Sequence, residues 1–253
     1  MENPILLSEE KRVYRDGAVV RRPEHAWSPS VRRFLKHLES DRLPVEHIIA
    51  VENGEELSAF IEGGLVHPHK WTDEALYEVG RLVAALHQSA AAFTPGPDDL
   101  WQPWCLRELG GDARICCHGD IAPWNVITDH GMPKALIDWE YAGPLDPLVE
   151  LARICWLFPQ LVDDDLQALY DLPSAEKRAG QVRLICDGYG LPAAQRRRLT
   201  RQILEVIICE TAHEAIDPGL TFDNHGPLWG FAWRTRSLYW VWRHQAVLDR
   251  ALQ

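Results

Sequence analysis

Residues 118–127 read HGDIAPWNVI, a stretch that places an acid, a proline and an amide in one short loop. Asp120 and Asn125 are five positions apart, and Pro123 between them restricts the backbone. An extended loop of this kind can direct both side chains into one cleft. The spacing therefore indicates a loop in which Asp120 and Asn125 act together.

A second acid follows in the run ALIDWE, residues 135–140. Asp138 comes directly after apolar residues, where a strand would hold its carboxylate close to the first two groups. Oxygen ligands suit magnesium, and phosphoryl transfer depends on positioning the reactants and on offsetting charge with Mg²⁺ and cationic side chains. We therefore expect Asn125 and Asp138 to be metal ligands, and Asp120 to accept or orient the proton of an acceptor hydroxyl.

Each of these residues also has an ordinary structural interpretation, because Asp and Asn are common in turns and at helix starts. The combination is more specific: HGDxxxxN is followed, thirteen positions after its asparagine, by the aspartate of IDWE. The combined pattern favours phosphoryl transfer.

Three segments resemble a known family: HGDIAPWNVI, ALIDWEYAGPLDPLVELA at 135–152, and VVRRP at 19–23 with a helix after it. The chain resembles the aminoglycoside phosphotransferases, which are relatives of the choline kinases and distantly of the protein kinases. The resemblance spans nearly the whole chain, and its specific motifs lie between His118 and Ala152. It implies a protein-kinase-like fold, ATP or GTP as phosphate donor, and the roles given above to the three oxygen-bearing residues.

The N-terminal part has the pattern of an antiparallel sheet. Asp16-Gly17 separates two β-prone runs, and Asn53-Gly54 separates the runs HIIAV and ELSAFI, so each pair predicts a hairpin. Between them, Ser28-Pro29 is typical of a helix start and is followed by apolar residues at helical spacing.

Beyond Gly63-Gly64 the apolar periodicity is mostly helical, apart from short strands at about 114–138. We therefore predict an α+β, protein-kinase-like two-lobe fold. A small antiparallel sheet lobe, residues 1–62, would bind the nucleotide. A larger, mainly helical lobe, residues 63–253, would carry catalysis and acceptor binding.

The nucleotide-binding cation is expected in the run AVVRR, residues 18–22, where protein kinases place a lysine. Strand alternation directs Arg21 and Arg22 to opposite faces, and alignment favours Arg21 as the cofactor-binding residue. A solvated strand charge is the alternative. The sequence assigns no glutamate partner, because Glu24 precedes the following helix and Glu39 falls at its end.

The loop expected to cover the phosphates, residues 7–11, contains no glycine that would let backbone amides approach them. This leaves a second hypothesis open. The chain would then be a catalytically weak kinase-like protein that binds a ligand or confers immunity without phosphorylating it.

Three further residues near the motifs are interpreted as structural. Asp146 before Pro147 is a natural helix N-cap, and Glu150 follows in the same helix. His118 is expected to orient the catalytic loop by hydrogen bonding rather than to transfer a proton.

The acceptor is expected to lie against the segment from Glu205 to Trp242, which is rich in aromatic and acidic residues. Aromatic walls with carboxylates can hold a hydroxylated amine by stacking, cation–π contact and hydrogen bonds. We predict Glu210, Glu214 and Asp223 as substrate-binding residues. The alternative for the tryptophans of this segment, including Trp229, Trp233 and Trp240, is that they pack the helical lobe.

Composition excludes several classes of protein. Of 253 residues, 46% are hydrophobic and 25% charged, as in globular proteins. The net charge of −11 disfavours nucleic acid as a partner, and either suits a cationic ligand or only keeps the protein soluble. The six cysteines form no CxxC pair, so reduced thiols rather than a zinc site are expected. The absence of a long apolar run and of a secretion signal favours a cytoplasmic protein.

The sequence thus predicts an enzyme that uses Mg²⁺ and transfers a phosphoryl group from ATP or GTP to a hydroxyl of a small molecule. An aminoglycoside-like antibiotic or an amino-alcohol metabolite would fit. A protein side chain is disfavoured as acceptor because no activation-loop insertion separates Asp138 from Pro144. The sequence leaves the oligomeric state open.

Overall fold

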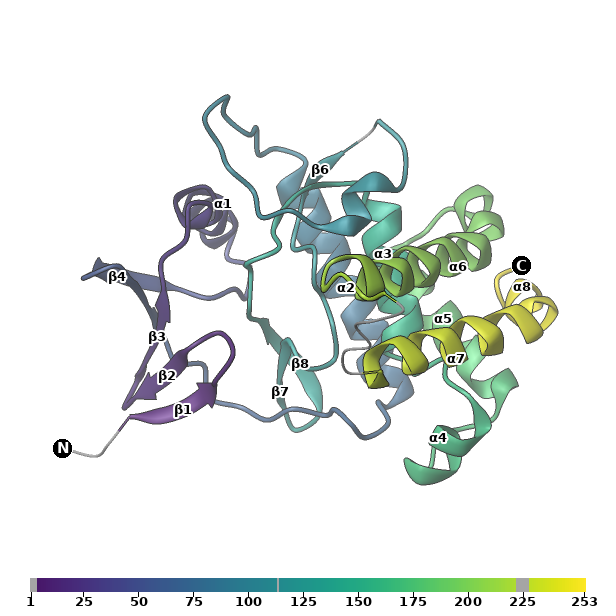
Figure 1. Ribbon diagram of the computed structural model, residues 1–253. Helices are drawn as coiled ribbons and strands as arrows, with labels where there is room; N and C mark the ends of the chain where they lie inside the picture. The colour runs from purple at the N-terminus through teal and green to yellow at the C-terminus, as the bar shows by residue number, and fades with distance from the viewer. Residues whose placement is uncertain (1–3, 113, 222–227) are drawn as a thin grey trace.

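The computed structural model describes residues 4–112, 114–221 and 228–253. A small sheet with one helix lies on one side of the molecule, a larger group of helices lies on the other, and short strands run between them (Figure 1). This arrangement confirms the predicted α+β fold of two lobes.

The N-terminal sheet is antiparallel, with the strand order β1-β2-β3-β5-β4 in the part of the chain described. Its strands are β1 (Ile5–Ser8), β2 (Val13–Asp16), β3 (Val19–Pro23), β4 (Ile48–Glu52) and β5 (Glu55–Ala59). The turn between β4 and β5 has φ of +54° at Asn53 and +79° at Gly54, as a two-residue hairpin requires. Both predicted hairpins are confirmed.

Helix α1 (Ser28–Ser40) joins the sheet to the helical core. Pro29 fits its first turn, where the missing N–H has no helical partner to lose. Phe34 is fully buried and meets the ring of Trp139 edge-on, with ring centroids 6.0 Å apart. Because Trp139 follows Asp138 in the chain, this contact holds the predicted metal-binding segment against α1.

The larger lobe is built from helices that, apart from α4, share one buried apolar cluster with α1; Leu166 of α4 packs in a second, smaller cluster. Its helices are α2 (Asp73–Ala90), the short η1 (Cys105–Glu108), α3 (Pro147–Leu157), α4 (Asp164–Leu169), α5 (Ala175–Tyr189), α6 (Ala193–Ile216), α7 (Trp229–Arg243) and α8 (Gln245–Ala251). Thr72 caps α2 by accepting a hydrogen bond from the amide of Ala75.

Two small antiparallel ladders lie between the lobes and carry the motif loops. β6 (Ile115–Cys117) pairs with β9 (Gly143–Leu145), and β7 (Val126–Asp129) pairs with β8 (Met132–Leu136). The loop from 118 to 125 therefore leaves β6 and enters β7, while the segment from 137 to 142 links β8 to β9. This pairing brings the two conspicuous motifs of the sequence side by side.

Among the described residues, no helix is both long enough and apolar enough to cross a membrane. The six cysteines are free thiols, and all except Cys209 are buried. The expected reduced state of these residues is thus consistent with their positions.

Candidate active site

Asp120 and Asn125 meet within the loop between β6 and β7. The Nδ2 of Asn125 donates to the Oδ2 of Asp120 and to its backbone oxygen, at 2.9 Å each. The two side chains are almost completely buried, so these bonds hold Asp120 in a fixed orientation. The five-residue spacing has the consequence expected from the sequence, because the loop folds back at Pro123 to bring its ends together.

Gly119 provides the sharp turn before Asp120. Its φ is +85°, and a Cβ atom at this position would lie 2.2 Å from the backbone oxygen of Tyr141. Glycine is therefore required both by the left-handed backbone and by the close approach of the neighbouring loop.

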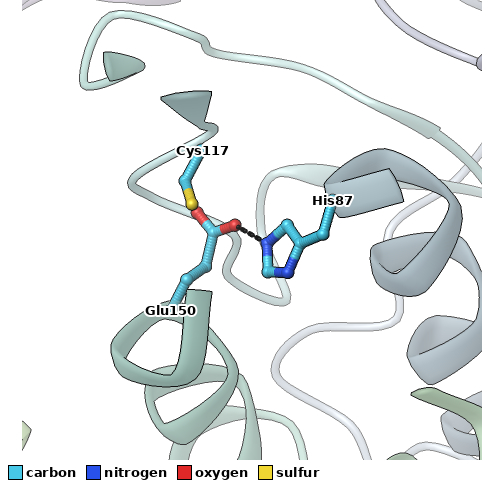
Figure 2. Close-up of side chains that lie close together, drawn as sticks. All are labelled: His87, Cys117 and Glu150. Carbon is cyan, nitrogen blue, oxygen red and sulfur yellow. Dashed lines mark hydrogen bonds and ion pairs between the residues drawn. The ribbon is translucent and has the colours of Figure 1, made fainter. Parts of the chain in front are cut away.

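Glu150, in the first turn of α3, bonds both to this loop and to His87; Figure 2 shows the pair with His87. Its Oε1 accepts from the amide of Gly119 at 2.5 Å, and its Oε2 pairs with the Nε2 of His87 at 2.7 Å. Burial would raise the pKa of Glu150, but the bond to His87 and the charges around it hold the pKa below its ordinary value. The structural role predicted for Glu150 agrees with these contacts.

The cluster drawn in Figure 2 brings His87, Cys117 and Glu150 close enough to suggest a metal site. Its donor atoms are, however, already engaged: the Nδ1 of His87 meets the hydroxyl of Tyr189 at 2.9 Å, and the thiol of Cys117 points to a backbone oxygen. Desolvation raises the pKa of Cys117, which keeps it protonated. The contacts of this cluster therefore help to hold the loop from 118 to 125 in place.

His118 orients the loop as expected. Its Nδ1 accepts a hydrogen bond from the amide of Asp120 at 3.2 Å, so the proton is on Nε2, which donates to the backbone oxygen of Ile137 at 3.0 Å. These bonds tie the loop of Asp120 to the segment of Asp138. Asp146 also acts as predicted: its Oδ1 caps α3 by accepting from the amide of Leu148.

Arg153, on α3, is a residue at this site that sequence reasoning missed. Its Nη2 lies 2.8 Å from the Oδ1 of Asp120, and its Nε lies 2.5 Å from the Oε1 of Glu210. Burial raises the pKa of Asp120, and the Arg153 cation opposes this rise. Burial alone would lower the pKa of Arg153, but Glu210 and Asp120 together raise it above its ordinary value, so Arg153 stays charged.

Asp138 lies in the left-handed region, with a φ of +67°. Such a backbone is costly for most residues and is tolerated by aspartate, typically at functional sites. The conformation is held from two sides: its amide donates to the Oε1 of Glu46 at 3.0 Å, and Trp139 is buried in the core. The carboxylate is thereby turned toward Lys11, whose Nζ lies 2.8 Å from its Oδ2.

The structure places Arg22, not Arg21, inside the cleft. The Nη2 of Arg22 bonds both oxygens of Glu46 at 2.7 and 2.8 Å, and its buried Nε has no hydrogen-bond partner among the described residues. Arg21 instead faces Asp16 and Glu55 on the outer side of the sheet, at 3.8 and 3.9 Å. Strand register thus directs Arg22, rather than Arg21, into the cavity between the lobes, because the two neighbours point to opposite faces.

Glu46, in the segment between α1 and β4, is the carboxylate partner that the sequence did not reveal. The two glutamates considered from the sequence are engaged elsewhere: Glu24 pairs with Arg32, and Glu39 pairs with His47, at 2.8 Å each.

Two cavities meet at Asp120. The first, about 390 Å³, lies between the lobes and is lined by Arg22 and Asp138 and by apolar side chains of both lobes. The second, about 480 Å³, lies against α6 and α7 and includes Arg153, Glu210 and Glu214 among its lining residues. Asp120 and Trp124 line both cavities, so a group bound in one can reach a group bound in the other.

The three predicted acceptor residues differ in their positions and contacts. Glu210 is buried and bonded to Arg153 and, at 3.4 Å, to Arg234, so it serves to position cations. Glu214 is one-third exposed, pairs with Arg234 at 2.9 Å and lines the second cavity. Asp223 lies outside the described residues.

The tryptophans of α7 divide between core and surface. Trp240 is buried in the helical core, as the packing alternative expects. Trp233 stacks on Trp156 with ring centroids 5.1 Å apart, and it also lines a third cavity of about 300 Å³. Trp229 and Trp242 are exposed.

The donor set at Asp138 fits a hard divalent cation. The amide nitrogen of Asn125 is used by Asp120, which leaves its oxygen as the ligand atom. Asp138 supplies a carboxylate whose charge is balanced by Lys11 and, at 4.0 Å, by Arg22. Carboxylate and amide oxygens are ligands that Mg²⁺ takes, so Asn125 and Asp138 are the residues that could hold it.

A family profile described as "Phosphotransferase enzyme family" matches residues 97–180, which include the whole catalytic segment. An amicoumacin kinase in complex with AMP-PNP and Ca²⁺ has a TM-score of 0.68 at 12% identity, covering 93% of this chain and 88% of that chain. A microcompartment-associated aminopropanol kinase gives a TM-score of 0.65 at 14% identity, covering 99% and 95%. Profile and fold together indicate the class: a protein of the phosphotransferase enzyme family with a protein-kinase-like fold.

The trifolitoxin immunity protein of Rhizobium leguminosarum bv. trifolii is 39% identical over 246 residues, covering 95% of this chain and 94% of that protein. The chain therefore belongs to the phosphotransferase enzyme family, with the trifolitoxin immunity protein as a relative along nearly its whole length.

Proposed function

We propose that the chain transfers the γ-phosphoryl group of ATP or GTP to a hydroxyl of a small molecule bound in the second cavity. One observation supports this above the others: Asp120 lines both the cavity between the lobes and the cavity beside α6 and α7. A donor in the first and an acceptor in the second would meet at its carboxylate.

In the proposed step the acceptor hydroxyl oxygen attacks the γ-phosphorus. The new oxygen–phosphorus bond forms as the bond to the bridging oxygen of the nucleoside diphosphate breaks, and the hydroxyl proton passes to Asp120. Asn125 and Arg153 keep the carboxylate of Asp120 oriented for this transfer. Mg²⁺, held by Asn125 and Asp138, would offset charge on the phosphate oxygens.

We assign the donor side to residues 1–62 together with the motif loops. Val20, Phe60 and Ile137 line the cavity between the lobes and offer an apolar place for a purine base. Arg22 would bind phosphate, because its guanidinium carries a buried N–H without a hydrogen-bond partner among the described residues.

For the acceptor side we propose a hydroxylated amine. Trp104, Trp124 and Tyr141 give the second cavity aromatic surfaces, and Glu214 and Asp217 line it with carboxylates. Aromatic faces and carboxylates together favour an ammonium group. Glu210 is buried between Arg153 and Arg234, whereas Glu214 is one-third exposed, so the specificity of this side would depend on Glu214 rather than on Glu210.

ADP release with aminoglycosides, amino alcohols and trifolitoxin as candidate acceptors tests the proposal. Turnover by the wild type that Asp120→Asn abolishes is expected. The Asn variant keeps the size of the side chain, and binding of a non-hydrolysable ATP analogue checks that its cleft is intact. Acceptor-dependent turnover that survives in Asp120→Asn would show that the base is assigned incorrectly.

A second candidate function is immunity by binding alone, which the relationship to the trifolitoxin immunity protein favours. In this case the chain sequesters a toxin in the second cavity without modifying it. Expression in a trifolitoxin-sensitive strain separates the two functions: protection by Asp120→Asn supports binding, whereas loss of protection, with the mass of one added phosphoryl group on toxin treated with wild type, supports transfer. We propose that the protein is cytoplasmic, because either function would need access there to the nucleotide or to the target.

A further inference from the structure

Lys11 lies in the turn between β1 and β2 and reaches across the cleft to the other lobe. Its Nζ lies 2.8 Å from the Oδ2 of Asp138 and also contacts the carboxylate of Glu140. Lys11 lines the cavity between the lobes, so its side chain is inside the space proposed for the nucleotide.

Two backbone amides of this turn are already engaged. The amide of Lys11 donates to the Oγ of Ser8 at 3.3 Å, and the amide of Arg12 donates to the backbone oxygen of Glu9 at 3.2 Å. The turn also contains no glycine. These features favour a side chain as the contact from this turn to a polyphosphate, and Lys11 is the cation of the turn that lines the cavity.

Asp138 is the point of competition. Lys11 holds its Oδ2, and the same carboxylate is one of the two groups that could hold a divalent cation. A strongly hydrated ammonium and a divalent cation cannot both occupy one oxygen at close range, because their charges repel. Ligation through the Oδ2 of Asp138 therefore requires Lys11 to leave, and the flexible four-carbon stem allows its Nζ to turn toward the centre of the cleft.

We propose that Lys11 is a phosphate-binding residue with two positions, one on Asp138 and Glu140, the other on the polyphosphate of a nucleotide whose metal ion has taken Asp138. This inference rests on the proposed function and extends it. Lys11 replaces the glycine-rich turn of other kinases with a single mobile cation, and it keeps the acidic cleft neutral until the metal–nucleotide enters.

The proposal makes opposite predictions for metal alone and for nucleotide in Lys11→Met, which keeps the length of the side chain without its charge. Mn²⁺ binding to the protein without nucleotide, followed by electron paramagnetic resonance, should tighten about tenfold, since a charged hydrogen bond to Asp138 no longer competes. Binding of a non-hydrolysable ATP analogue with Mg²⁺, measured by calorimetry, should weaken about tenfold or more, while adenosine binding should not change.

Two variants serve as controls. Lys11→Arg keeps the charge and should bind Mn²⁺ as weakly as the wild type. Lys36→Met removes an exposed lysine from α1 and should change neither measurement. Thermal unfolding of each variant verifies that the fold is retained.

The outcomes separate this inference from the proposed function. Unchanged Mn²⁺ affinity in Lys11→Met would show that Lys11 does not compete for Asp138, and unchanged affinity for the ATP analogue would show that it does not bind phosphate; either overturns the proposal. Wild type that binds no ATP analogue overturns it as well, together with the proposed function. If the two opposite shifts occur but no acceptor is phosphorylated, the role of Lys11 stands while phosphoryl transfer fails.

Discussion

In the proposed reaction the carboxylate of Asp120 must be ionised to accept a proton, so its environment would set the acid limit of activity. Burial raises the pKa of Asp120 above its ordinary value, and Arg153 restrains that rise. Activity of the wild type should therefore fall, as the pH decreases, at a higher pH than an exposed aspartate would give. A profile of kcat/KM against pH, with any acceptor found by ADP release, measures this limb.

Arg153→Met should move that limb to still higher pH, because the cation next to Asp120 is removed and its carboxyl becomes harder to ionise. Arg153→Lys keeps a positive charge and should lie close to the wild type. An acid limb in Arg153→Met at the wild-type position would show that Arg153 does not tune Asp120, whatever its effect on the maximal rate.

At this scale, residues close in sequence were predictable and distant pairs were not. The bond between Asp120 and Asn125 follows from a loop of six residues. Lys11 and Asp138 are 127 positions apart, and Arg22 and Glu46 are 24 positions apart, so their meeting depends on how the lobes and strands are placed. To choose Arg22 over Arg21, one must know which face of β3 points into the cleft. The spacing of two adjacent arginines contains no information about that face.

Among the elements, α3 contributes most to the site, since its first two turns carry Glu150 and Arg153. Asp146 begins this helix by bonding the amide of Leu148, and its Oδ2 also accepts from the amide of Gly111 at 2.8 Å. Asp146→Ala should lower the free energy of unfolding by about 0.5–2 kcal/mol, measured by urea denaturation. Asp146→Asn retains an N-cap and should lose much less; equal losses in both variants would rule out capping as the cause.

Glu150 allows a prediction of stability against pH. Its pKa is lowered in the folded protein, so its bonds to His87 and Gly119 stabilise the fold above the pKa of an unfolded glutamate and lose that contribution as the pH falls through the lowered folded value. Glu150→Gln should be less stable than the wild type by about 1.5–3 kcal/mol near neutral pH, with the two converging in acid. A difference that stays constant down to the acid transition would contradict an ionised Glu150.

Elements with local signals were predicted well. The turns at Gly17 and at Asn53-Gly54 require positive φ, which the residue types themselves indicate. The caps at Thr72 and Asp146 are likewise short-range chemistry. The paths of the segments around Glu46 and Lys11 lacked such signals, since these residues form ion pairs with residues distant in the sequence, Arg22 and Asp138.

For the molecule as a whole, the cleft requires both lobes. Arg22 and Lys11 come from the sheet lobe, whereas Asp120, Asn125 and Asp138 come from the motif loops, so a nucleotide bound between them would link the two parts. A ligand that binds only the folded protein stabilises it by an amount set by its concentration and dissociation constant, about 2.7 kcal/mol at one hundred times the constant.

The neighbouring arginines of β3 provide a matched test of this link. An ATP analogue with Mg²⁺ should raise the thermal midpoint of the wild type and of Arg21→Met by similar amounts, because Arg21 faces Asp16 and Glu55 outside the cleft. Arg22→Met should lose most of the rise, because the guanidinium that lines the cavity between the lobes is gone. Differential scanning calorimetry of the three proteins with and without ligand measures both midpoints. A rise lost in Arg21→Met and kept in Arg22→Met would restore the assignment made from sequence alignment and would mean that the inward face of β3 is reversed when nucleotide binds.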